Sequence, residues 1–301
     1  MSTSALALGT QVVTRVRLPA DTEGIVRPAG AVGVVVEARG EGPHAYRVRF
    51  PDGGEAVLSR EDVAIRKHAQ WEGRSLASDD PDLYGYVILR CVVGSRAYGL
   101  DEDGSDTDRR GLYLPPAELH WSLMGVPEQL ENEEMQETYW ELQKFLTLAL
   151  KANPNVLECL YTPMVEHATP LAQEMLQMRS VFLSRLVYQT YNGYVMSQFK
   201  KLETDLRTRG EIRWKHAMHL IRLLVSGVQV LREGFVPVRV EEHRQTLLAI
   251  RRGEAPWDEV NAWRLALHRD FDAAYSETKL PERPDYEAAN AFLVRARRSM
   301  V

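Results

Sequence analysis

The sequence has 301 residues, of which 45% are apolar and 26% are charged, and its formal net charge is −5. These values are typical of a globular protein of about two domains, and they exclude a disordered or fibrous chain. No run of 18 apolar residues indicates a membrane span, and the first residues lack the basic and then apolar pattern of a signal peptide. We therefore expect a cytoplasmic protein that does not enter a membrane.

The charges are distributed unevenly along the chain. Residues 74–170 contain 17 acidic and 7 basic residues, whereas residues 181–252 contain 13 basic and 6 acidic residues. This division predicts an acidic part that holds a metal ion and a basic part that meets phosphate groups. The alternative is that the basic part is only a set of solvated helix faces.

Short β-rich segments separated by Gly, Pro and Asp turns make up the beginning of the chain. Strands are expected near residues 11–18, 31–37, 46–50 and 55–58. Four or five such strands predict a small β-barrel of SH3-like type, an accessory domain covering residues 1–67. Packing of this domain against the next one is favoured over direct RNA binding, and its partner is left open. A polar linker is expected at 67–83.

The most informative stretch is residues 88–114. Apolar residues predict a buried strand that ends at Gly94 and Ser95, where glycine lets backbone N–H groups approach an anion. Asp106 and Asp108 follow after ten intervening residues. On a strand, their carboxylates would point to the same face, as a divalent cation requires. The pattern predicts a site for a metal-bound triphosphate, with an acidic surface loop as the alternative.

The spacing of Gly94, Ser95, Asp106 and Asp108 resembles that of the DNA polymerase beta nucleotidyltransferase superfamily. The longer string Gly-Ser-Arg-Ala-Tyr-Gly, followed by Ser-Asp-Thr-Asp-Arg-Arg-Gly, is similar to one branch, the RNA-repair-associated polymerase-beta-like nucleotidyltransferases. The likeness runs from about residue 84 to residue 298. It implies an α+β fold in which a nucleotidyltransferase catalytic core, residues 74–170, precedes a C-terminal α-helical bundle, residues 171–301.

Two-metal nucleotidyl transfer uses three carboxylates. The resemblance places the third one on the strand before an expected helix, where Glu137 falls, and Glu134 and Glu141 are its competitors. We therefore predict Asp106, Asp108 and Glu137 as catalytic, metal-binding residues. The expected cofactor is a pair of Mg²⁺ ions, with Mn²⁺ as a substitute.

A helix expected at residues 211–233 has a cationic face. Lys215, His219 and Arg222 lie at positions i, i+4 and i+7, and cations stacked this way repel each other unless an anion lies between them. The alternative is a solvated basic face. With the resemblance, the predicted nucleotide- and phosphate-binding residues are Gly94, Ser95, Arg96, Tyr98, Ser105, Arg110, Lys215, His219 and Arg222.

The string Asn153-Pro154-Asn155, followed by Glu158, matches a further signature of the same family. The residue before a proline is pushed out of the helical region, so that Asn-Pro ends the preceding helix. The two asparagines can cap or order the turn. For this string a structural role is favoured over a chemical one.

We expect an enzyme that moves a nucleoside monophosphate from an NTP to a hydroxyl acceptor. The resemblance implies that the acceptor is an RNA end, with tRNA as a candidate. The alternatives are nucleotidylation of a protein or a small molecule, a non-catalytic RNA-binding or regulatory protein with the same fold, and a partner-docking protein that works through its barrel. The NTP used, the number of nucleotides added and the oligomeric state are left open.

Overall fold

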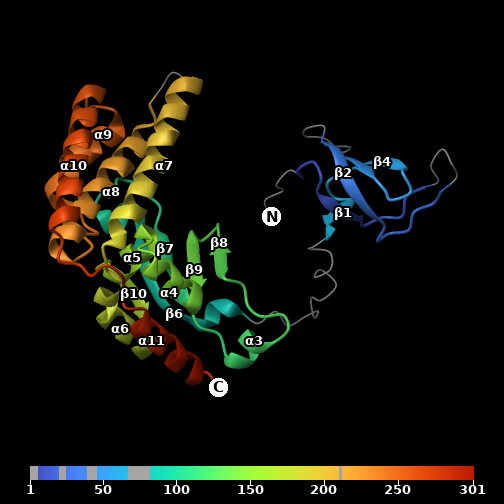
Figure 1. The fold of residues 1–301 in the computed structure, drawn as a ribbon, viewed down its shortest axis with the longest axis horizontal. Coiled ribbons are helices and arrows are strands. Elements are labelled where there is room, and N and C mark those ends of the chain that lie inside the picture. Colours follow the sequence, from blue (N-terminus) through green and yellow to red (C-terminus); the bar gives the residue numbers. More distant parts are fainter. Residues whose placement is uncertain (1–5, 20–24, 39–45, 67–81, 210–211) are drawn as a thin grey trace. The chain divides into compact units, whose positions relative to one another are not determined.

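The computed structural model describes residues 6–19, 25–38, 46–66, 82–209 and 212–301 (Figure 1). The chain divides into two compact units, Met1–Pro81 and Asp82–Val301. The predicted linker at 67–83 lies outside the described residues except for its last two. In the described part of the chain, no helix combines the length and the apolar character that crossing a bilayer requires.

The first unit contains one antiparallel sheet whose strands pair in the order β4-β3-β2-β1-β5. Alternate residues such as Val12, Val35 and Val48 are buried in its core. Strands β4 and β5 form the two edges, and no pairing between described residues closes the sheet. The predicted SH3-like barrel is therefore not confirmed, since the sheet is open. The strands are β1 (Gln11–Thr14), β2 (Val32–Ala38), β3 (Tyr46–Arg49), β4 (Glu55–Leu58) and β5 (Val63–Ile65).

The second unit is built on a five-stranded mixed sheet with the order β10-β6-β7-β9-β8. Strands β7 and β9 are parallel, and the other neighbours are antiparallel. This topology puts β7, which carries Asp108, in the centre of the sheet. The strands are β6 (Val87–Val93), β7 (Asp108–Tyr113), β8 (Gln129–Asn132), β9 (Glu137–Glu141) and β10 (Val165–Ala168).

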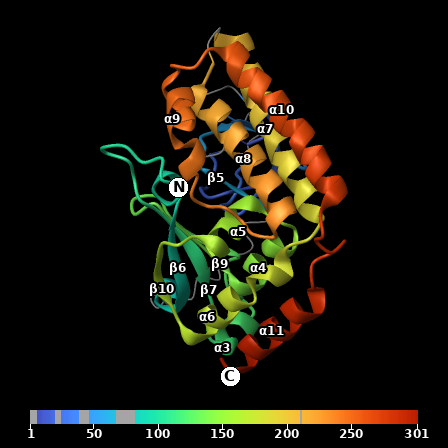
Figure 2. The ribbon, with the colours of Figure 1, turned by 90° about the vertical axis from the view of Figure 1, so that its left-hand side faces the viewer.

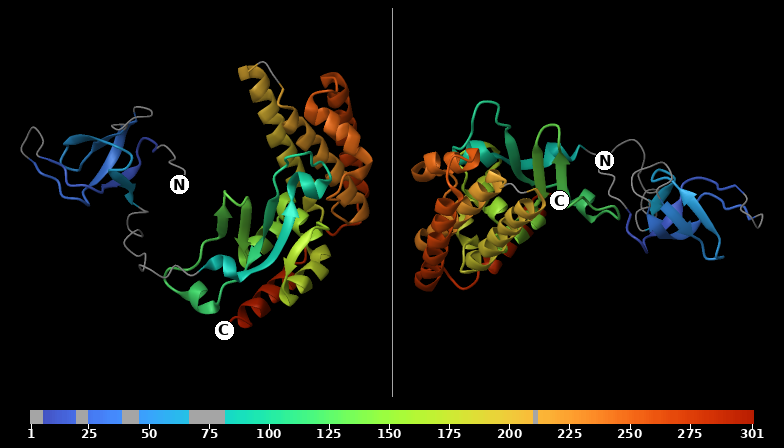
Figure 3. Two further views of the ribbon diagram at one scale, coloured as in Figure 1. Left: turned by 180° about the vertical axis from the view of Figure 1, so that it is seen from behind. Right: turned by 90° about the horizontal axis from the view of Figure 1, so that it is seen from above.

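The two faces of this sheet have different roles. Leu89, Cys91 and Leu112 belong to the large core shared with the helices, whereas Tyr113 and Tyr139 belong to a smaller apolar cluster. Because side chains alternate along a strand, residues 108, 110 and 112 of β7 point to the helix-covered face. Figure 3 shows the helices gathered on one face of the sheet.

Helices dominate the second unit after residue 170. Helix α8 packs against α7, α9 and α10, and α11 packs against α4 (Figure 2). These helices lie where the bundle is expected, and the bundle class itself stays a prediction. The helices are α2 (Gly94–Tyr98), α3 (Ala117–Trp121), α4 (Leu142–Leu150), α5 (Pro154–Tyr161), α6 (Pro170–Gln177), α7 (Leu186–Arg209), α8 (Trp214–Glu233), α9 (Arg244–Arg252), α10 (Trp257–Glu277) and α11 (Tyr286–Arg298).

Gly111 lies at a close approach of β6 and β7, where a Cβ atom would overlap the backbone carbonyl oxygen of Leu89. Backbone cannot rotate away, so the two strands would have to separate. We expect Gly111→Ala to lower the free energy of unfolding by about 1–3 kcal/mol, as overpacking does elsewhere, measured by urea denaturation. Gly85→Ala is the control, because nothing lies within 4 Å of a Cβ atom there. Equal stability of both variants would contradict the close approach.

Candidate active site

A cavity of about 770 Å³ lies between the helix-covered face of the second sheet and helices α7, α8 and α9. Its volume is in the usual range for small-molecule sites. Most residues predicted for the site line it, but Arg96 and Glu137 do not. The predicted residues in the lining are Gly94, Ser95, Tyr98, Ser105, Asp106, Asp108, Arg110, Lys215, His219 and Arg222.

The turn at Gly94 brings the expected phosphate site and the aspartate pair together. Gly94 has a φ of +71°, which favours glycine, and a Cβ atom there would overlap the carboxylate of Asp108. Strand pairing places Asp108 directly opposite Val93, the residue before the turn. The Asp108 carboxylate therefore packs against the bare backbone at the start of α2.

Arg96 and Ser105 hold the loop that leads to the aspartates. The Arg96 guanidinium donates to the carbonyl oxygen of Ser105 at 2.7 Å and to that of Asp106 at 3.3 Å. The Ser105 hydroxyl accepts from the backbone N–H of Glu102 at 2.9 Å. In this state both side chains orient Asp106, and the structure does not bring Arg96 into the cavity as a phosphate ligand.

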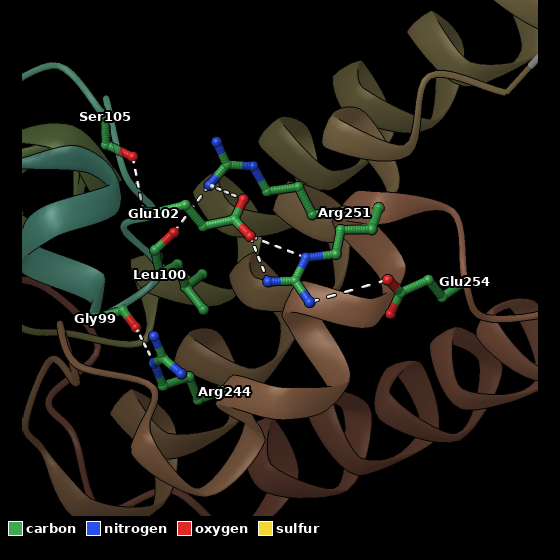
Figure 4. A network of polar contacts seen from close by, with 8 residues as sticks. Gly99, Leu100, Glu102, Ser105, Arg244, Arg251 and Glu254 are labelled. Atoms are coloured by element: carbon green, nitrogen blue, oxygen red, sulfur yellow. Dashed lines mark hydrogen bonds and ion pairs between the residues drawn. The ribbon is translucent and has the colours of Figure 1, made fainter.

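Arginines of α9 fix the preceding part of the same loop (Figure 4). Arg244 donates to the carbonyl oxygen of Gly99 at 2.6 Å, and Arg251 donates to that of Leu100 at 2.9 Å. These arginines are not among the predicted site residues. They attach α9, which lies about 150 positions later in the chain, to the backbone that follows the phosphate turn.

Glu102 completes this attachment through its side chain. Arg252 donates to its carboxylate through Nε at 2.9 Å and through Nη2, and Arg251 lies 3.9 Å away. The hydrogen bond with Arg252 lowers the pKa of Glu102, so that the carboxylate stays ionised. Of the acidic residues near the cavity, Glu102 is thus already paired with protein cations.

Glu137 is not brought together with the two aspartates. It pairs in register with Arg109, and paired residues of neighbouring strands point to the same face, which is the face opposite to Asp108. Its charge acts there on Arg109, Tyr84 and Tyr139. The nearby residue that lines the cavity is Gln136, an amide.

The carboxylates at the cavity fit a Mg²⁺ site that has two protein carboxylate ligands, and not a site that has three. In the part of the chain that the structure describes, no three His, Cys, Asp or Glu side chains converge as a metal site. Mg²⁺ is commonly held by one or two carboxylates together with substrate phosphate oxygens and water. Asp106 and Asp108, which line one cavity beside the phosphate turn, are suited to that mode.

A buried charge pair forms the floor of the cavity. The Glu158 carboxylate accepts from Arg222 Nη1 and from the Tyr98 hydroxyl, both at 2.6 Å, and the Arg222 guanidinium lies 3.8 Å from the centre of the Tyr98 ring. All three side chains are buried. Burial raises the pKa of Tyr98, which therefore remains a donor. Because Glu158 neutralises Arg222, we expect this arginine to support the fold, and its binding of phosphate stays a prediction.

The remaining cations of the cavity are better placed for an anion. Arg110, Lys201 and Lys215 line it, and none has an ion-pair partner among the described residues. His219 lies beside them and is half-buried. Burial, followed by the charges of Arg222 and Lys215, lowers the pKa of His219 to about 3. The imidazole is therefore neutral at physiological pH, and it acts as a hydrogen-bonding group and not as a cation.

Two cavity residues on α7, Tyr194 and Gln198, were not predicted from the sequence. With Lys201 they lie at positions i, i+4 and i+7 and so share one helix face. Their spacing was visible in the sequence, but Tyr, Gln and Lys are also common on solvent-exposed helix faces, so the spacing alone did not indicate a binding site. Asn155, predicted to order a turn, also lines the cavity.

Replacing Arg222 tests the buried pair. Arg222→Met keeps much of the side-chain volume but leaves the Glu158 carboxylate buried without a cation, so we expect a loss of about 3–5 kcal/mol in the free energy of unfolding. Adding Glu158→Gln should restore part of the loss. Arg232→Met, at an exposed position of the same helix, is the control. Unchanged stability of Arg222→Met would show that the guanidinium is held for a ligand.

The low pKa of His219 predicts a pH dependence of stability. The unfolded chain takes up a proton near pH 6.5, whereas the folded chain does so only near pH 3, so the folded state loses about 1.4 kcal/mol per pH unit between these values. Above pH 6.5 the effect is absent. Between pH 7 and 5.5, wild type should lose about 1 kcal/mol more stability than His219→Gln in urea denaturation. Parallel pH curves would contradict a buried neutral imidazole.

Comparison with known proteins shows the family of the chain. The model of the RNA repair pathway DNA polymerase beta family matches residues 66–295. The chain is also 27% identical over 158 residues to the uncharacterized protein YcgL of Bacillus subtilis, an alignment that covers 51% of this chain and 60% of that protein. The chain therefore spans less than two thirds of this relative. Since the family match extends over most of the sequence, the chain belongs to the RNA repair pathway DNA polymerase beta family of nucleotidyltransferases.

Proposed function

We propose that the chain is a Mg²⁺-dependent nucleotidyltransferase that moves a nucleoside monophosphate from an NTP to the hydroxyl of an RNA end, with tRNA as a candidate. One observation carries this proposal. Asp106 and Asp108 line the same cavity as the turn at Gly94 and Ser95, and Lys215, which has no ion-pair partner in the described part of the chain, lines it from α8. Metal ligands, phosphate donors and a cation therefore surround one space.

The residues of the cavity have different roles in the reaction. Ser95 and the backbone N–H groups at the start of α2 hold the terminal phosphates of the NTP. Arg110 and Lys215 neutralise the charge that grows on the transferred group and on the leaving pyrophosphate. The neutral His219 donates a hydrogen bond to a phosphate oxygen. The acceptor hydroxyl attacks the α-phosphorus as the bond to pyrophosphate breaks.

Asp106 and Asp108 would hold the metal ion. Bound Mg²⁺ supplies charge neutralisation for the triphosphate and favours ionisation of the acceptor hydroxyl. The arginines of α9 keep the loop before Asp106 in one position, so that the two carboxylates are oriented before substrate enters. Mn²⁺ has similar ligand preferences and would substitute.

The RNA acceptor is supported by the family, whose description places it in RNA repair. We further propose that residues 74–170 form the catalytic core and that residues 171–301 form a helical domain that covers the nucleotide. Residues 1–67 would be an accessory domain. A labelled-NTP assay that offers RNA, protein and small hydroxyl compounds side by side tests the acceptor, and labelling of protein alone would overturn it.

Removal of either aspartate tests the chemistry. We expect Asp106→Asn and Asp108→Asn each to reduce nucleotidyl transfer by at least about 100-fold, because an amide binds Mg²⁺ poorly. Folding should be preserved, since one negative charge is removed from a crowded acidic site. Transfer is measured with labelled NTP, and folding by circular dichroism and urea denaturation.

Glu137→Gln is the matched control, because it makes the same carboxylate-to-amide change on the opposite face of the sheet. We expect it to keep most of the activity, within a factor of about three. Full activity in either aspartate variant would contradict the proposed function. Loss of activity in Glu137→Gln with the fold intact would instead restore Glu137 as the third metal ligand.

A further inference from the structure

The lining of the cavity divides by charge. Carboxylates and cations surround the turn at Gly94, whereas a second part of the lining carries no charge. An NTP divides in the same way, because its triphosphate is strongly anionic and its base is neutral. If the charged part takes the triphosphate, the uncharged part is left for the base. The uncharged part consists of Asn155, Tyr194, Gln198, Met218 and Leu223, and it is bordered by Lys201 on α7 and by Lys215 and His219 on α8.

Hydrogen bonds join two of the elements that carry these uncharged residues. Asn153 caps α5 by accepting from the backbone N–H of Asn155 at 3.0 Å, and its side-chain amide donates to the Tyr194 hydroxyl at 2.8 Å. Gln198 follows Tyr194 by one turn on the same face of α7. The start of α5 and the middle of α7 are thereby held together beside the cavity.

The two amides of this subsite have hydrogen-bonding capacity that the protein does not use. The Oε1 atom of Gln198 is buried and has no hydrogen-bond partner among the described residues. The side chain of Asn155 makes no hydrogen bond to any residue that the structure describes. Leaving a buried carbonyl oxygen without a donor costs free energy, and a ligand that brings an N–H group would recover it.

The chemistry of the bases decides which ligand fits. Adenine and cytosine each carry an exocyclic amino group next to a ring nitrogen that accepts, and a Gln or Asn amide matches this pair with two hydrogen bonds. Guanine and uracil present a carbonyl oxygen at the corresponding position, and an oxygen cannot satisfy the buried Gln198 acceptor. The ring of Tyr194 and the side chain of Met218 offer apolar contact for the flat faces of a base.

Resting on the proposed function, we propose that Gln198, assisted by Asn155, recognises the exocyclic amino group of the base and makes ATP and CTP the preferred nucleotides. Gln198 is then a specificity residue, separate from the metal and phosphate ligands. The recognition needs no charge and acts at the opposite end of the nucleotide from Asp108. Its loss should change which NTP binds and leave binding of the triphosphate unaltered.

The test is calorimetric titration of the full chain with ATP, CTP, GTP, UTP and inorganic triphosphate, each with Mg²⁺. Wild type should bind ATP and CTP about tenfold or more tightly than GTP or UTP. Gln198→Leu should weaken ATP binding by about tenfold, the effect of one hydrogen bond between neutral groups, and should bind triphosphate as wild type does. Gln189→Leu makes the same change at an exposed position of α7 and should behave as wild type.

Two results with the NTPs would overturn the inference while the proposed function stands: wild type binds GTP or UTP as tightly as ATP and CTP, or Gln198→Leu keeps the preference for ATP and CTP. If wild type binds neither NTP nor triphosphate, the proposed function fails together with the inference. A parallel loss of ATP and triphosphate binding in Gln198→Leu would mean that the residue supports the cavity as a whole, and this too would overturn base recognition.

Discussion

The contact between Tyr98, Glu158 and Arg222 is the constraint on which the second unit depends. It joins α2, α5 and α8 through one carboxylate that is buried at the floor of the cavity. Helix α2 carries the phosphate turn, α5 follows the asparagine turn, and α8 supplies the basic wall. A buried ion pair of this kind adds little net stability compared with apolar packing, but breaking it is costly. It therefore favours one arrangement of the three elements over alternatives in which the carboxylate would lie unpaired.

The same contact determines how the remaining charges are used. With Arg222 neutralised, the cations that lack a protein partner among the described residues are at the rim of the cavity, at positions such as Lys201 and Lys215. The acidic residues follow the same division. Glu102 is paired with arginines of α9, whereas Asp106 and Asp108 form no salt bridge to a described residue. Carboxylates and cations that could cancel each other are thus held apart, and a metal-bound triphosphate fits between them.

Local patterns in the sequence predicted the parts of the site that lie close together in the chain. The apolar run before Gly94 and the periodicity of α8 each indicated an element that the structure contains. Of the two aspartates expected on one strand, Asp108 begins β7, whereas Asp106 lies in the loop before it. The prediction of Glu137 was limited, because a strand pattern does not show which face of the strand points to the active site. In the structure Glu137 pairs with Arg109, so its side chain points away from the aspartates. Strands β8 and β10 were also missed, since both are short, polar and at the edges of the sheet.

Other features depend on distant contacts and could not be predicted. Arg244 and Arg251 meet the loop after α2 across about 150 positions of the chain, and nothing in their local sequence distinguishes them from solvated arginines. The prediction that Arg222 binds phosphate was limited in the same way, because it did not take the distant partner Glu158 into account. A row of cations on one helix is visible in the sequence, but the buried carboxylate that neutralises one of them comes from α5.

The close approach at Gly111 also protects the active site while the sheet forms. If β7 slipped by one residue against β6, Arg110 or Leu112 would meet the carbonyl oxygen of Leu89 in place of a glycine, and neither could approach so closely. The same slip would move Asp108 to the wrong face of the sheet, because side chains alternate along a strand. One glycine thus makes the misregistered sheet, in which the metal ligands are lost, the less stable product of folding.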